Sequence, residues 1–338
     1  MIPADSAWYD AVRHHAALID RSHRGRLVVS GPDRATYLQG LLTNDIVALR
    51  TGQGCYSAYL TPQGRMIADM CVYELGDVIL MTLAGDAKDA VLTRLDQFVF
   101  AEDVQLGDVS ASFAQWAVVG PRAAPTIAAL LEGVSEATLR AMPEHGNARI
   151  DLRGSAAIVT RTSDAGEPGF DLYVDILQRA ALRAAVADAG VPLVDQAIAD
   201  TIRIEAGVPV FGRDMDEDTI PLEAGIESRA ISFTKGCYVG QEVIVRVLHR
   251  GHGRVARKLV GLRLDGDRVA AAGTTVLAGD KEVGRVTSST WSPALERPIA
   301  LAYVHRDFVE PGTPLTAGGA AAQVAALPFV RIAEAGSP

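Results

Sequence analysis

The chain has 338 residues, of which 49% are hydrophobic and 22% are charged, and its net charge is −9. This size and composition are typical of a globular protein with two or three domains, and they exclude an intrinsically disordered chain. The negative charge argues against general binding to nucleic acids or anionic membranes, because both need a positive field. No run of eighteen apolar residues and no signal-peptide pattern occurs, so we expect a cytoplasmic protein without a membrane segment.

The three cysteines, Cys55, Cys71 and Cys237, are widely separated, and no pair has the C-x-x-C spacing. An odd number of dispersed cysteines is typical of a protein from a reducing compartment without a disulfide framework. Cys55 and Cys71 lie in apolar, strand-like runs, which predicts buried and unreactive thiols. A zinc or cluster site needs several ligands at suitable spacing, so we expect no metal site.

The first half of the chain alternates strand-like and helical segments. Residues 26–30 are predicted to form a strand, and Pro32 marks the first turn of a helix that extends to about Leu42. Two strand-like runs, 55–60 and 65–75, are joined by Thr-Pro-Gln-Gly, which favours a hairpin turn. Short antiparallel groups of strands with helices between them indicate an α+β fold rather than a doubly wound parallel sheet.

The composition changes towards the end of the chain. After about residue 255 short strand candidates are divided by Gly, Pro and Asp, which predicts a small closed β-domain. We therefore divide the chain into an α+β region, 1–254, and a C-terminal β-barrel, 255–338. The α+β region is expected to consist of two similar halves, 1–145 and 146–254. No G-x-G-x-x-G or P-loop sequence occurs, so no nucleotide cofactor is expected.

The segment Lys235–Glu242, with the sequence KGCYVGQE, combines a thiol, a cation and two glycines. The ammonium of Lys235 is two residues from Cys237, and a nearby positive charge favours the thiolate. Residues 214–227 contain six acids and no base, whereas residues 235–258 contain six bases, two histidines and one acid. This pattern favours a site with a reactive thiol over a solvated surface. The alternatives are a small Cys filling a tight turn, and bases that contact a partner protein or RNA.

KGCYVGQE, followed by Arg246 and the sequence His-Arg-Gly, resembles the signature of the YgfZ family of folate-binding proteins. That family belongs to the same superfamily as the T-protein, the aminomethyltransferase of the glycine cleavage system. Four further segments resemble characteristic segments of the superfamily: 30–46, 64–75, 161–174 and 199–225. The resemblance implies a T-protein-like, folate-binding fold of two α+β halves with a C-terminal β-barrel.

The resemblance also implies a folate site, with tetrahydrofolate or a one-carbon derivative as the cofactor. Asp69 matches an acid that assists chemistry at N5 of the folate, and together with Cys237 it is the expected catalytic group. Asp171 matches an acid that binds the pterin, although its side chain is one methylene shorter than the usual Glu. Arg203 matches a helix Arg that shapes the folate site, and Phe211 matches an aromatic residue that is Tyr in T-proteins.

Lys235 is a further cofactor-binding candidate, because the basic segment could hold the polyglutamate tail of folate. Two superfamily features are missing: Asp164 stands in the region where an aromatic residue helps to enclose the folate, and the Asn that follows the acidic strand has no match. Structural alternatives also exist. Asp69 and Asp171 could be ordinary strand acids, and Arg203 could pair with acids on its own helix, which contributes only tenths of a kcal/mol.

We prefer the hypothesis that the chain is a folate-binding accessory protein for the assembly or maintenance of iron–sulfur proteins, with an indirect effect on tRNA modification. Its partners would be iron–sulfur enzymes or cluster-assembly proteins, and Cys237 would supply the functional thiol. The alternative is a tetrahydrofolate-dependent aminomethyltransferase or one-carbon demethylase. A third possibility is an interaction protein that has lost the ligand.

Overall fold

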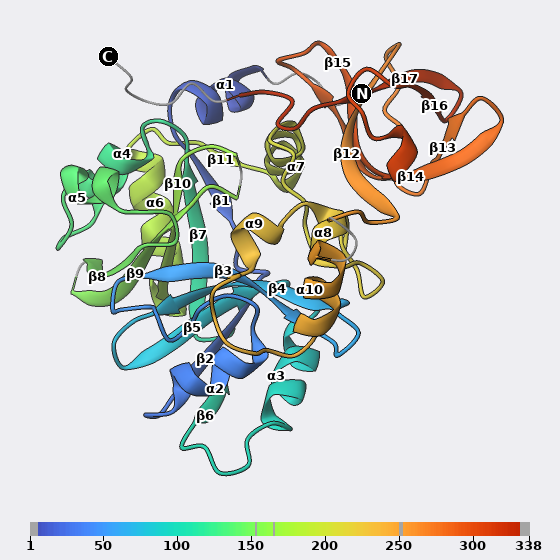
Figure 1. The fold of residues 1–338 in the computed structure, drawn as a ribbon. Coiled ribbons are helices and arrows are strands. Elements are labelled where there is room, and N and C mark those ends of the chain that lie inside the picture. Colours follow the sequence, from blue (N-terminus) through green and yellow to red (C-terminus); the bar gives the residue numbers. More distant parts are fainter. Residues whose placement is uncertain (1–5, 153, 165, 250–252, 332–338) are drawn as a thin grey trace.

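The strands form three sheets, of which two lie in the α+β region and the third is a closed barrel (Figure 1). The predicted α+β class and the C-terminal β-barrel are therefore confirmed. Three residues of the basic segment, Arg250, Gly251 and His252, lie outside the described residues. The computed structural model describes residues 6–152, 154–164, 166–249 and 253–331.

The five-stranded sheet is antiparallel throughout, and helices α2 and α3 pack against it. Its apolar side chains alternate along each strand, so that one face joins the core formed with these helices. The predicted hairpin is confirmed as β3 and β4. In sheet order the strands are β3 (Gly54–Leu60), β4 (Met66–Glu74), β5 (Val78–Leu83), β2 (Gly25–Ser30) and β6 (Gln105–Asp108), and the helices are α2 (Arg34–Leu41) and α3 (Lys88–Asp96).

The six-stranded sheet draws strands from both predicted halves of the α+β region. Strands β1 and β7 come from residues 1–145 and pair with strands of residues 146–254, so the sheets do not coincide with these halves. In sheet order the strands are β11 (Leu193–Val194), β1 (Ala17–Asp20), β7 (Phe113–Val119), β10 (Gly169–Asp175), β9 (Ser155–Thr162) and β8 (Asn147–Leu152). Its covering helices are α4 (Ala123–Leu130), α5 (Glu136–Ala141) and α6 (Arg179–Asp188).

The C-terminal barrel closes because its first strand, β12, pairs with both β15 and β17. Closure removes the unpaired strand edges that an open sheet of this size would expose. The strands in order are β12 (Arg257–Leu264), β15 (Arg297–His305), β14 (Lys281–Ser292), β13 (Thr275–Ala278), β16 (Pro314–Ala317) and β17 (Ala320–Ala325).

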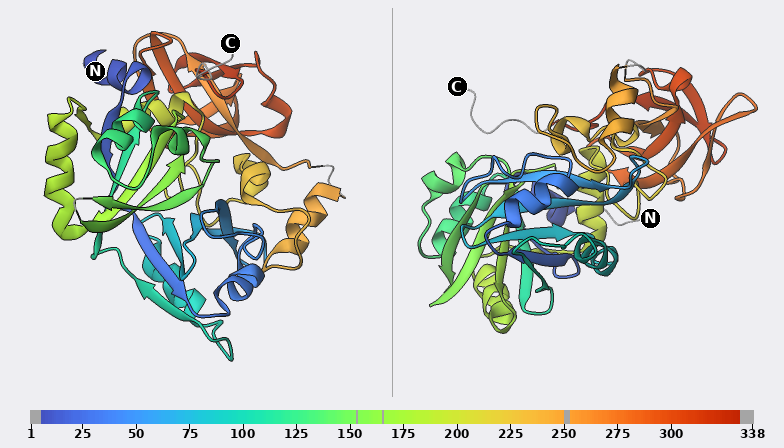
Figure 2. Two further views of the ribbon diagram at one scale, coloured as in Figure 1. Left: turned by 90° about the vertical axis from the view of Figure 1, so that its left-hand side faces the viewer. Right: turned by 60° about the horizontal axis from the view of Figure 1, so that its bottom comes forward.

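Helix α7 lies between the six-stranded sheet and the barrel (Figure 1), and it contacts β1, β14 and β15. The short helices α8 and α9 follow it, and α10 lies close to the β3–β4 hairpin. Figure 2 shows the barrel on one side of the two sheets. The remaining elements are α1 (Ser6–His14), η1 (Ile176–Gln178), α7 (Gln196–Glu205), α8 (Pro221–Ala224), α9 (Glu227–Ala230), α10 (Gln241–His249) and η2 (Arg306–Phe308).

The turn of the β3–β4 hairpin needs a glycine for two reasons. Gly64 has a φ of +75°, and a Cβ atom there would lie 2.9 Å from the Cβ of Val243 on α10. A side chain would therefore be strained by its backbone and would push α10 away. None of the helices in the described part of the chain combines the length and the apolar character that crossing a bilayer requires.

Glu205, at the end of α7, links segments that are distant in the sequence. Its side chain is fully buried, and its carboxylate accepts hydrogen bonds from Tyr9 (2.7 Å), Arg13 and Ser292. Its backbone carbonyl accepts from the backbone N–H of Phe329 at 2.8 Å. The carboxylate thus receives donors from α1 and from the barrel at one buried point.

Candidate functional site

A cavity of about 1180 Å³ opens between the two sheets and α7, and we call it the central cavity. Its walls come from the β1–β2 connection, from β3 and β4, from the β9–β10 turn, and from α7 with the loop that follows it. Three of the predicted site residues line it: Asp69, Arg203 and Phe211. In the described residues no group of three or more His, Cys, Asp and Glu is arranged to hold a metal ion.

Asp69 lies on β4 in the cavity wall, where it accepts a hydrogen bond of 2.6 Å from the hydroxyl of Tyr56 to its Oδ2 atom. The strand register explains the contact: Ala58 pairs with Asp69 and Tyr56 pairs with Cys71, so Tyr56 is a diagonal neighbour of the acid. Burial raises the pKa of Asp69, although the hydrogen bond from Tyr56 opposes this effect. A raised pKa makes the carboxylate a stronger base, which favours its accepting a proton.

Asp171 does not line the central cavity. The residue is 2% exposed, and its side chain accepts hydrogen bonds from Arg21 (3.1 Å) and from Nε2 of Gln115 (2.8 Å). The acid that the cavity presents in this region is Asp164, whose Oδ2 atom lies 3.8 Å from Nη1 of Arg21. Asp171 therefore lies behind the cavity wall, where it binds Arg21.

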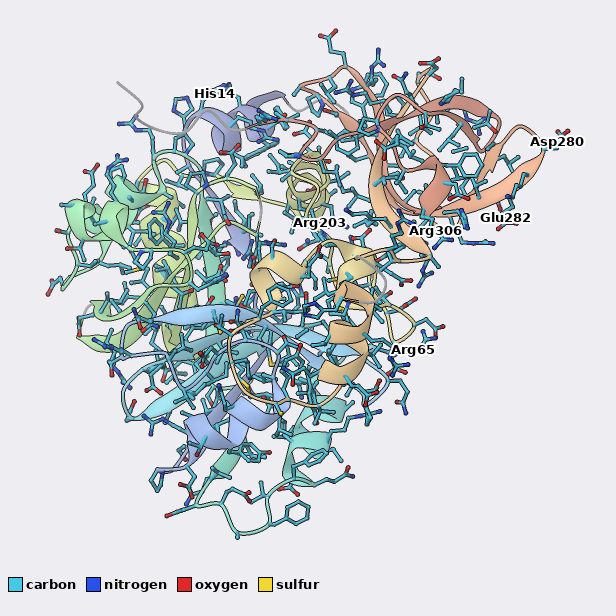
Figure 3. The ribbon with its side chains drawn as sticks, in the orientation of Figure 1. His14, Arg65, Arg203, Asp280, Glu282 and Arg306 are labelled. Carbon is cyan, nitrogen blue, oxygen red and sulfur yellow. The ribbon has the colours of Figure 1, made fainter. Side chains whose placement is uncertain are left out.

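Arg203 lies at the centre of the molecule, where α7 meets the barrel (Figure 3). Its Nη1 atom donates to Asp214 (2.8 Å), its Nε atom to Asp200 (3.0 Å), and its Nη2 atom to Ser288 on β14 (2.9 Å). Arg203 is 5% exposed, so this network is buried. Arg203 thereby fixes the loop after α7, and this loop carries Phe211 into the cavity wall.

Lys235 and Cys237 do not line the central cavity. The Nζ atom of Lys235 donates to three backbone carbonyl oxygens at the end of α2, those of Gln39 (2.6 Å), Leu42 (2.7 Å) and Asn44 (2.8 Å). A cation is favourable there because the carbonyl end of a helix is negative. Burial lowers the pKa of Lys235 to about 8. Cys237 is an exposed free thiol.

Most residues of the cavity wall are not identified by the sequence, and three of them carry polar groups on which the site depends: Tyr56, Arg24 and Asp164. Tyr56 could have been found, because the predicted hairpin register already places it beside Asp69. At Asp164 the sequence shows only that the expected aromatic residue is absent. Arg24 could not be identified, because the sequence does not show that β2 and β4 both pair with β5.

Comparison with known proteins covers nearly the whole chain. Residues 3–235 match the family described as the GCVT N-terminal domain, and residues 257–330 match the glycine cleavage T-protein C-terminal barrel domain. An aminomethyltransferase from Nostoc sp. is 35% identical over 317 residues, which cover 91% of this chain and 81% of that protein. One from Rubrobacter xylanophilus is 33% identical over 334 residues, which cover 96% of this chain and 86% of that protein.

A solved structure is similar over the same extent. The crystal structure of the glycine cleavage system aminomethyltransferase T from Bartonella henselae has a TM-score of 0.86 and 25% sequence identity. The similarity covers 96% of this chain and 89% of that chain.

These comparisons correct the preferred interpretation of the sequence. The role as an accessory protein for iron–sulfur proteins, with its effect on tRNA modification, is wrong, because the similar proteins are named aminomethyltransferases. The YgfZ-type assignment is likewise not supported, whereas the superfamily is confirmed. The earlier interpretation depended on the eight residues of Lys235–Glu242. The similarity to aminomethyltransferases extends over both the α+β region and the barrel.

Proposed function

Because the chain belongs to the family of the glycine cleavage T-protein, we propose that it is a tetrahydrofolate-dependent aminomethyltransferase. This family uses tetrahydrofolate as substrate or cofactor. The observation that carries the proposal is the position of Asp69, a buried carboxyl held by Tyr56 in the wall of the central cavity. The volume of about 1180 Å³ suits a ligand of the size of folate.

In the proposed reaction the carbon of an aminomethyl group forms bonds to N5 and N10 of tetrahydrofolate. Its bonds to the carrier and to the departing ammonia break, and the protons of N5 and N10 pass to these leaving groups. Asp69 accepts the N5 proton and returns it to a leaving group, a role that its raised pKa supports. The cavity adds the advantage of holding both reactants close together.

The other cavity residues position the folate. Phe211 offers an apolar surface for an aromatic ring of the ligand, and Arg203 keeps the loop of Phe211 in place. Asp171 orients Arg21 from behind the wall. In this proposal residues 1–254 carry the folate site and residues 255–338 form the barrel. The catalytic role of Cys237 and the folate contact of Lys235 stay predictions.

The test is a transfer assay with the full chain, tetrahydrofolate and an aminomethylated carrier protein, in which methylene-tetrahydrofolate is measured. We expect turnover, and a loss of about 10²–10⁴-fold in Asp69→Asn, the usual contribution of a general acid or base. The rise in melting temperature that folate causes should persist in this variant. The matched control is Asp86→Asn, an exposed acid at the same cavity. Folate binding without turnover by the unmodified chain would overturn the proposal.

A further inference from the structure

Two arginine side chains at the central cavity have no carboxylate partner. Among the described residues, no Asp or Glu oxygen lies within 4.0 Å of Arg24 or Arg229. The Nε atom of Arg24 donates to Oγ1 of Thr82 at 3.3 Å, and in the described part of the chain its two terminal nitrogens meet no acceptor. The guanidinium of Arg229, on α9, lies 5.3 Å from the centre of the Tyr56 ring. Four other cavity arginines are each paired with an acid: Arg21 with Asp171, Arg179 with Asp20, Arg203 with Asp214, and Arg213 with Asp200.

Arg24 and Asp69 lie at the same edge of the five-stranded sheet. Met70 on β4 and Gly25 on β2 both pair with Leu83 on β5, so the next residues, Asp69 and Arg24, share one face with β5 between them. Two strand spacings separate their Cα atoms by roughly 10 Å. Ala84, which continues β5 between them, is small and lines the cavity. The side chains of Arg24 and Asp69 thus face a common space.

The pairing of charges around this space is incomplete. Arg21, Asp164 and Asp171 form one cluster, in which Arg21 binds Asp171 and lies 3.8 Å from Asp164. Arg229 is exposed, whereas Arg24 is half-buried, and within the described residues its terminal nitrogens meet no acceptor. A desolvated cation without a partner is costly, and a bound anion removes that cost. A carboxylate fits best, because its two oxygens match the paired N–H groups of a guanidinium.

Asp69 adds the second half of the recognition. Its Oδ2 atom accepts the hydrogen bond from Tyr56, which leaves Oδ1 to accept from an amine of a ligand. We propose that Asp69 and Arg24, with Arg229 facing them from α9, form a binding site for a small zwitterionic amino acid. The amine of the ligand contacts Asp69, and its carboxylate contacts the guanidinium of Arg24. This inference rests on the proposed function, and it adds an amino acid as a further small ligand that binds beside folate, distinct from the carrier-bound aminomethyl group.

The glutamate of folate also carries carboxylates that a guanidinium could bind. The length of folate distinguishes these carboxylates from that of an amino acid. The pterin and the glutamate lie at opposite ends of folate, with an aminobenzoyl ring between them. A folate whose pterin lies at Asp69 therefore cannot also place its glutamate at the neighbouring Arg24. The central cavity, at about 1180 Å³, exceeds the roughly 300–1,000 Å³ of a pocket for one drug-sized ligand, so a second small molecule has room.

The first experiment measures binding to the full chain by titration calorimetry, with tetrahydropteroate present, a folate analogue that lacks the glutamate. The probes are N-methylglycine, dimethylamine (the same amine without a carboxylate) and acetate (the carboxylate without an amine). We expect N-methylglycine to bind at least about tenfold more tightly than either half, because it makes both charge-assisted contacts. Equal affinities for N-methylglycine and dimethylamine would overturn the proposal, as would the absence of any N-methylglycine binding.

The second experiment assigns the carboxylate contact. We expect Arg24→Gln to weaken the binding of N-methylglycine by about tenfold or more. The matched control is Arg213→Gln, whose arginine is already paired with Asp200, and it should leave this binding unchanged. Melting temperatures are measured to check that both variants are folded. If Arg24→Gln weakens the binding of tetrahydrofolate but not that of tetrahydropteroate or N-methylglycine, Arg24 binds the glutamate of folate and the inference is wrong. Because binding is the readout, this result is independent of whether the transfer assay succeeds.

Discussion

The hydroxyl of Tyr56 and the carboxyl of Asp69 are joined by a 2.6 Å hydrogen bond across β3 and β4, at the wall of the central cavity. The pKa of Asp69 is raised and that of Tyr56 lies well above its usual range, in both cases chiefly because of burial. At neutral pH Tyr56 therefore keeps its proton and donates it in this bond. The hydrogen bond stabilises the ionised form of Asp69, which the proposed reaction uses.

Tyr56→Phe removes this donor and keeps the ring. The pKa of Asp69 should then rise further, since a hydrogen bond to the charged form is lost. We expect the acidic limb of the profile of kcat/KM against pH to move to higher pH. Tyr59→Phe, on the same strand but in the core on the other face, is the control and should leave the limb in place. An unchanged limb in Tyr56→Phe would mean that the hydrogen bond does not tune Asp69.

Asp69→Asn should change the pH dependence of stability. The folded-state pKa of Asp69 is raised above its ordinary value of 3.8, so above that pH the folded chain holds a proton that the unfolded chain has lost. The stability of the unmodified protein therefore falls as pH rises through this window, and Asp69→Asn lacks this loss. We expect the melting temperature of the variant, relative to the unmodified protein, to be higher at pH 7.5 than at pH 4. The same difference at both pH values would contradict the raised pKa.

Arg203→Met should destabilise the fold more than a surface substitution. It leaves the buried carboxylate of Asp214 without its cation, and breaking such a pair costs about 3–5 kcal/mol. Denaturant unfolding measures this loss, and Arg140→Met on the surface of α5 should stay within about 0.5 kcal/mol. Adding Asp214→Leu to Arg203→Met should cost less than the two single changes together. Strict additivity would argue against a direct coupling.

Lys235→Met tests a structural role. Three carbonyl oxygens at the end of α2 lose their donor, so we expect a loss of about 2–4 kcal/mol in the free energy of unfolding. The same variant tests the folate contact that the sequence predicts for Lys235; because Lys235 does not line the central cavity, we expect folate binding to stay unchanged instead. Lys258→Met, an exposed residue of β12, is the control.

Titration of Lys235 adds a second signature. Its folded-state pKa of about 8 lies below the ordinary value of 10.5, so between these values the unfolded chain binds more protons. The unmodified protein should therefore gain stability as pH rises through that window, and Lys235→Met should gain less. A loss of folate affinity without a loss of stability would instead assign Lys235 to the ligand.

The sequence is sufficient where the structure depends on local patterns. Alternating apolar residues and the turn before Gly64 predict the β3–β4 hairpin, and Gly-bounded short strands predict the barrel. The acid on β4 could be selected for the same reason, because Asp69 interrupts an apolar strand. The iron–sulfur role, inferred from one short motif, is the prediction that failed.

The long-range contacts could not be predicted from the sequence. The burial of Asp171 depends on Arg21 and Gln115, which belong to elements far from it in the chain. Likewise, Lys235 was assigned to the thiol two residues away, whereas its ammonium is bound by carbonyls almost 200 residues earlier. Charge spacing along a chain shows which groups are available, and only the packed fold decides how they pair.

The carboxylate of Glu205 affects how the protein unfolds. It takes its donors from α1 and from the barrel, with Arg13 also bound to Glu167. If α1 or the barrel detached, the buried carboxylate of Glu205 would lose hydrogen-bond donors. We therefore expect the α+β region and the barrel to melt in one cooperative transition. A fragment without either segment would carry the same defect. The two regions are thus separate in architecture and joined in their thermodynamics.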